Sequence, residues 1–118
     1  MNMDLKITTL DTTGGVELRR PPRPPLLKPE RIQERLKALP SWRLMPGDEA
    51  IGSLRQLQSA PMAASYAAFV AGYAGFKRLP VTLECSGKQV MITLRGRDLN
   101  GAPGGLTEEV FDFAEVLG

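Results

Sequence analysis

A run of prolines divides the chain near residue 28 and limits the part of it that can fold into a packed domain. Five of the ten prolines lie between positions 21 and 29, interleaved with Arg19, Arg20 and Arg23. Such a run favours the extended polyproline II form, because proline has a fixed φ and no backbone N–H. We expect residues 1–28 to form a flexible, Pro/Arg-rich N-terminal arm, and residues 29–118 to form one domain. The arm is either a solvated linker or a basic strand that docks on a partner, and the sequence leaves both open.

Residues 29–118 show two kinds of hydrophobic periodicity. Helical spacing predicts helices over 29–39, 60–76 and 108–117, the second capped by Ser59 and the third by Thr107. Alternation predicts strands over 42–44, 51–57, 81–85 and 90–95, arranged as two hairpins. Hairpins with helices between them predict an α+β fold of two layers. We expect a four-stranded antiparallel sheet with three helices on one face.

Two side chains in these patterns lead to specific expectations about burial. Trp42 follows the first helix at the start of a strand, so we expect it to anchor the core. Cys85 alternates with Val81 and Leu83, which predicts a buried and chemically inert thiol.

The second predicted helix has a face made only of small side chains. Such a face allows another backbone to approach closely, either in the core or in an oligomer, and the edge strands of an open sheet offer a second symmetric contact. We expect at least a homodimer. The small residues are Ala64, Ala68, Ala71 and Gly75.

The complete absence of histidine excludes many kinds of functional site. Zinc sites draw on His and Cys, and this chain has no His and the single Cys85, so we expect no metal site. Catalytic triads and most general acid–base pairs also need an imidazole. One cysteine forms no internal disulfide, and the N-terminal residues show neither a signal peptide nor a membrane span. We expect a cytoplasmic protein that does not contact a membrane.

Charge is distributed unevenly along the chain. Residues 98–118 carry −5 with no Lys or Arg, and residues 1–97 carry +7. This asymmetry suits contact with an acidic surface, or self-association of unlike faces. The basic residues are scattered and no nucleic-acid motif is present, so we expect no nucleic-acid partner.

Several segments resemble the pterin-4a-carbinolamine dehydratase family. Val90–Asp98 reads VMITLRGRD and Gly104–Glu109 reads GGLTEE, where the family has a strand ending in Thr-His-Asp and a helix opening with Gly-Gly-Leu-Thr. Leu36–Leu44 is similar to the family's first helix entering its first strand, and Arg78-Leu79-Pro80 stands in place of His-His-Pro. The resemblance covers residues 30–118 and implies the same order of elements.

The family's enzymes dehydrate a 4a-hydroxytetrahydropterin with histidines as acid and base. Arg78, Leu79 and Arg97 stand at the vacated histidine positions, and Pro80 and Asp98 are retained. Arginine stays protonated at physiological pH, and leucine transfers no proton. We therefore expect no catalytic residues, no cofactor and no enzymatic activity.

A degenerate scaffold behind a proline-bearing arm resembles the dehydratase-like proteins associated with α-carboxysomes. That resemblance implies a bacterial assembly factor, or chaperone, for ribulose-bisphosphate carboxylase/oxygenase (Rubisco), with Rubisco subunits as partners. Two alternatives stay open: a residual dehydratase, and a protein-binding co-regulator on the same fold. The candidate partner-binding residues are Arg19, Arg20, Arg23, Arg78, Arg95 and Arg97.

Overall fold

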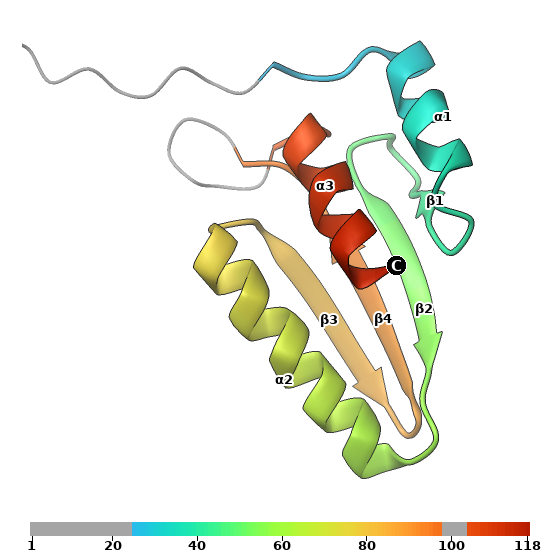
Figure 1. The fold of residues 1–118 in the computed structure, drawn as a ribbon, viewed down its shortest axis with the longest axis vertical. Coiled ribbons are helices and arrows are strands. Elements are labelled where there is room, and N and C mark those ends of the chain that lie inside the picture. Colours follow the sequence, from blue (N-terminus) through green and yellow to red (C-terminus); the bar gives the residue numbers. More distant parts are fainter. Residues whose placement is uncertain (1–24, 98–103) are drawn as a thin grey trace, which may run out of the picture.

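The computed structural model describes residues 25–97 and 104–118, which form one sheet and three helices (Figure 1). The predicted α+β fold, with a four-stranded antiparallel sheet and three helices on one side, is confirmed. In chain order the elements are α1 (Pro29–Lys37), β1 (Arg43–Leu44), β2 (Ile51–Gln56), α2 (Ala60–Lys77), β3 (Val81–Ser86), β4 (Gln89–Leu94) and α3 (Glu108–Leu117).

The strands lie in the order β1-β2-β4-β3, and every neighbouring pair is antiparallel. β2 and β4 are the two central strands, and Ile92 of β4 pairs with Ser53 of β2 and Leu83 of β3. The alternation predicted for β4 is confirmed: Val90, Ile92 and Leu94 are inaccessible to solvent, whereas Met91 and Thr93 are half-buried.

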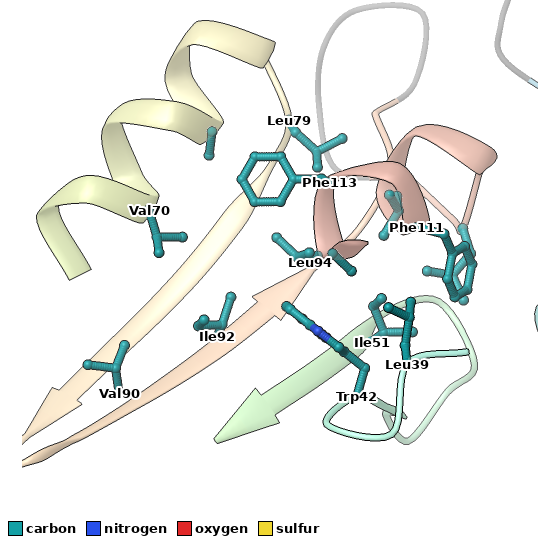
Figure 2. Packing of buried hydrophobic residues seen from close by; sticks show 14 of the residues in the cluster. Leu39, Trp42, Ile51, Val70, Leu79, Val90, Ile92, Leu94, Phe111 and Phe113 are labelled. Atoms are coloured by element: carbon teal, nitrogen blue, oxygen red, sulfur yellow. The ribbon is translucent and has the colours of Figure 1, made fainter. Parts of the chain in front are cut away.

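One hydrophobic core fills the space between the sheet and the helices (Figure 2). Trp42 is buried in it, as expected, with its ring beside the buried face of the sheet. Phe111 and Phe113 enter from α3, and Val70 enters from α2. All three helices contribute side chains to this core, which fixes their positions over the sheet.

The two ends of α2 follow from single residues. Ser59 caps its first turn as predicted, since its hydroxyl accepts the Met62 N–H at 3.2 Å. At the other end Arg78 adopts a left-handed conformation, φ 56° and ψ 41°, which usually requires glycine. The Leu79 N–H then donates to the Ala74 carbonyl at 2.9 Å. This turn directs Leu79 back into the core, where it is 6% exposed.

Two expectations about single side chains were wrong. Cys85 is exposed rather than buried. It lies on β3, an edge strand with one neighbour, and the burial of β3 fades from Val81 toward the turn. Thr107 does precede α3 but makes no capping hydrogen bond, and its buried Oγ1 has no partner among the described residues.

The length and hydrophobicity of the helices in the described part show whether any of them could span a membrane. None of these helices is long and apolar enough to cross a bilayer.

Candidate functional site

The β3–β4 hairpin brings residues 78–80 and 95–97, the two segments where the resemblance places the family's histidines, to one end of the sheet. Val81 pairs with Leu94 in this hairpin, and the Arg95 N–H donates to the Pro80 carbonyl at 3.4 Å. Residues 78–80 and 95–97 therefore lie side by side, although the 14 residues of the hairpin separate them in the chain. Arg78 is exposed, whereas Arg95 and Arg97 are half-buried.

Beside this end of the sheet, an open groove of about 300 Å³ lies between the C-terminal part of α2 and α3. Leu79, which lies beside Phe113 (Figure 2), forms part of its apolar surface, so one of the vacated positions lines the groove directly. The rings of Tyr73 and Phe113 stack against each other there, with centroids 4.8 Å apart. The groove is lined by Tyr73, Lys77, Leu79, Glu109, Asp112, Phe113 and Val116.

Arg97, a second vacated position, reaches the edge of the groove through an ion pair. Its Nη2 lies 3.4 Å from Oε2 of Glu109. The close contact between Gly96 and Gly105 brings Arg97 to this place, since the Gly96 N–H donates to the Gly105 carbonyl at 2.9 Å. A Cβ atom on Gly96 would overlap that carbonyl oxygen, so this approach requires glycine.

The opposite side of α3 is tied to α1 by an ion-pair cluster. Arg35, with a side chain 13% exposed, contacts Glu108, Asp112 at 3.1 Å and Glu115 at 2.8 Å. Arg31 donates from Nε to Glu108 at 2.7 Å. These contacts fix α3, and with it the acidic edge of the groove.

The ion pairs of this cluster shift the pKa of Arg31, Arg35 and Glu108. Hydrogen bonds from Arg31, and also from Arg35, hold the pKa of Glu108 below its ordinary value of 4.5, against the opposing effect of burial. Burial lowers the pKa of Arg35, but hydrogen bonds to Asp112 and Glu108 outweigh it and raise that pKa. Hydrogen bonds to Glu108 and Glu34 raise the pKa of Arg31. Arg31, Arg35 and Glu108 are therefore all ionised at neutral pH.

Sequence reasoning found Leu79 and Arg97 but missed the rest of the groove. The signal was present in part, because Tyr73 and Lys77 are four residues apart, and Glu109, Asp112, Phe113 and Val116 share one face of α3. The sequence does not show that these two helix faces meet. Asp98, Arg19, Arg20 and Arg23 lie outside the described residues.

The groove combines stacked rings and aliphatic side chains with carboxylates at its edge. Such a surface suits an apolar or ring-shaped group that also carries positive charge. Within residues 25–97 and 104–118, no group of three or more Cys, Asp or Glu side chains is placed to hold a metal ion.

Comparisons with known proteins bear on the fold. No family model matches the chain, and no curated protein does. Among solved structures, the chain is similar to the crystal structure of a transcriptional coactivator/pterin dehydratase from Brucella melitensis. The TM-score is 0.66 at 23% identity, and the match covers 79% of this chain and 95% of that one. The chain has a pterin dehydratase-like fold.

Proposed function

We propose that this chain is a non-catalytic binding protein on a pterin dehydratase-like fold that assists the assembly of Rubisco in association with α-carboxysomes. The observation that carries the proposal is the burial of Leu79 in the groove surface, at a position where the resemblance places a catalytic histidine. A leucine there can contribute contact area but cannot donate or accept a proton. The groove is thus suited to binding.

The arginine at the other vacated position supports the same proposal. Arg97 is engaged by Glu109, and a guanidinium stays charged at any physiological pH. It can recognise a carboxylate with paired hydrogen bonds, which is a property of binding surfaces. We place the Rubisco contact at the end of the sheet that presents Arg78, Arg95 and Arg97.

The alternatives require other observations. A residual dehydratase needs an acid–base pair. In the described groove the only groups that could transfer a proton are Tyr73, Lys77 and two carboxylates. Both carboxylates are already paired with an arginine, Glu109 with Arg97 and Asp112 with Arg35. A co-regulator would bind a transcription factor, and no feature of this surface specifies one.

We also propose that the protein assembles as a homodimer through the outer face of α2. Met62, Phe69 and Phe76 are exposed there at seven-residue spacing, by 48%, 57% and 80%. Residues 60–76 carry no charge at all, which is unusual for an exposed helix surface. A Cβ atom on Gly72 or Gly75 would meet nothing within 4 Å among residues 25–97 and 104–118, so packing in this part of the fold does not require these glycines.

The spacing makes this face complementary to itself. In an antiparallel pair of α2 helices centred on Phe69, Met62 of one copy meets Phe76 of the other, as a twofold axis requires. The small residues between them let the helices approach closely. Light scattering should show a dimer that Phe69→Glu dissociates. Leu54→Glu, which changes an exposed apolar residue of β2, should leave the dimer intact.

The proposed function is tested by co-expressing the chain with the Rubisco subunits of the same genome. The yield of soluble, assembled Rubisco should rise several-fold relative to an empty vector. Charge reversal by Arg97→Glu should reduce that gain, whereas Lys88→Glu, in the turn at the far end of the β3–β4 hairpin, should not. Rubisco yield that is unchanged by the wild-type chain would reject the proposal.

A further inference from the structure

The groove between α2 and α3 has the surface chemistry of a site for a proline-rich strand. Sites that bind polyproline II segments have exposed aromatic walls against which proline rings pack, and acidic groups for flanking basic residues. Tyr73, half-buried, supplies an aromatic ring here that is backed by the buried ring of Phe113, and Val116 extends the apolar surface. Val116 is 61% exposed, so this surface is open to solvent.

The α3 side of the groove presents carboxylates that have room for further donors. Glu109 is contacted by Arg97 at 3.4 Å, a long distance for a charged hydrogen bond. The Asp112 side chain is 69% exposed, and Arg35 contacts only one of its oxygens within the described residues. Glu109 and Asp112 form the acidic row of the groove, whereas Glu115, which is paired with Arg35, does not line it. Lys77, the one cation lining the described groove, lies on the α2 side above the rings of Tyr73 and Phe76.

The described chain begins beside this row. The Leu27 N–H donates to the Leu106 carbonyl at 3.0 Å, and the Leu26 side chain lies against Gly105. The described chain therefore begins, at Pro25, near the N-terminal end of α3 (Figure 1). From Leu106 to Val116 the helix rises about 15 Å. Six residues in polyproline II form span about 19 Å, so the segment before Pro25 can reach the full length of α3.

We propose that residues 19–24, Arg-Arg-Pro-Pro-Arg-Pro, dock along α3 in this groove of their own chain. The prolines pack on Tyr73 and Val116, and the arginines pair with Glu109 and Asp112. Little ordering entropy is lost, because a proline run is already close to its bound form and is tethered to the site. The inference goes beyond the proposed function and does not depend on Rubisco.

Paramagnetic relaxation in the full-length chain tests the docking. A spin label is attached at Val16→Cys in a Cys85→Ser background, since Cys85 is exposed and replaceable. The amide signals of Asp112, Phe113 and Val116 should lose most of their intensity. Those of Gly47 and Gly87, which lie in the turns of the two hairpins, should keep theirs.

A charge-reversed arm separates docking from simple tethering. The triple variant Arg19→Glu, Arg20→Glu, Arg23→Glu keeps the tether and the prolines, and should restore the signals along α3. Asp112→Lys with the wild-type arm should restore them as well, whereas the matched change Asp48→Lys, in the turn between β1 and β2, should not. The proposal is overturned if the signal loss persists in both the triple arm variant and Asp112→Lys. It is also overturned if the labelled chain shows no signal loss at all. The second result would leave the groove open to a segment of a partner.

Discussion

The guanidinium of Arg35 lies 2.8 Å from the carboxylate of Glu115, and this contact joins the first helix of the domain to the last. The same guanidinium also contacts Glu108 and Asp112, so one largely buried side chain holds three turns of α3 in place. Because α3 supplies most of the groove residues, the shape of the groove depends on this arginine.

Replacing Arg35 with methionine should therefore destabilise the domain. Methionine supplies an apolar side chain of similar length, but the variant loses the guanidinium over the Phe111 ring and the hydrogen bonds to the three carboxylates. Loss of charged hydrogen bonds at a site this buried costs about 1–3 kcal/mol. Urea unfolding measures the loss. Lys37→Met, an exposed change in the last turn of the same helix, serves as the control and should alter the free energy of unfolding by less than about 0.5 kcal/mol.

The stability of the domain should fall in acid partly because of Glu108. Its pKa in the folded protein is depressed by Arg31 and Arg35, so its contribution is present above the ordinary pKa of 4.5. That contribution is lost as the pH drops below 4.5 and through the lower folded pKa. Glu108→Gln should be less stable than the wild type at pH 7 and should lose less stability between pH 7 and pH 3. If Glu108→Gln lost as much stability between pH 7 and pH 3 as the wild type, this role of Glu108 would be contradicted. Glu49→Gln is the control, and it should lose as much stability over this range as the wild type.

Arg78 should carry a cost in stability that is separable from its role in binding. Its left-handed conformation disfavours any side chain with a Cβ, so Arg78→Gly should raise the free energy of unfolding by about 1 kcal/mol. Because the proposed Rubisco contact includes Arg78, the same variant should support less Rubisco assembly. Asp48→Gly, at the second non-glycine position with positive φ, should give a smaller gain and unchanged assembly, because aspartate tolerates this conformation better. Loss of stability in Arg78→Gly would contradict this account of the helix end.

The two residues expected to cap helices should respond differently to removal of their hydroxyls. Ser59→Ala breaks a capping hydrogen bond to Met62 and should cost about 0.5–2 kcal/mol. Thr107→Val should cost nothing or stabilise slightly, because its buried hydroxyl has no partner among the described residues. Thermal unfolding of both variants measures the difference. An equal loss in the two would mean that Thr107 is satisfied by a group such as an ordered water.

The order of elements was predictable because local patterns specify it. Alternation in β4 and the helical spacing of α3 are both strong, and each agrees with the fold. Cys85 shows the limit of alternation, since a pattern identifies which face of a strand a residue is on but not how far the neighbouring helix covers that face. The edge position of β3 decided the outcome.

The groove was predictable only in part, because it depends on contacts between distant segments. Leu79 and Arg97 were found through the resemblance, whereas Tyr73 and Phe113 look like ordinary core residues in their own helices. The pairing of Arg35 with Glu108 had a readable signal, since acidic residues recur on one face of α3. No sequence rule states which helix that face meets.

Turnover of a 4a-hydroxytetrahydropterin by the purified chain tests most directly the claim that this site binds rather than catalyses. With leucine and arginine at the vacated positions, dehydration should proceed at the rate seen in solution without protein, and Asp98→Asn should not change it. Turnover above the solution rate that Asp98→Asn abolishes would contradict the claim and would identify the chain as a dehydratase that works without histidine.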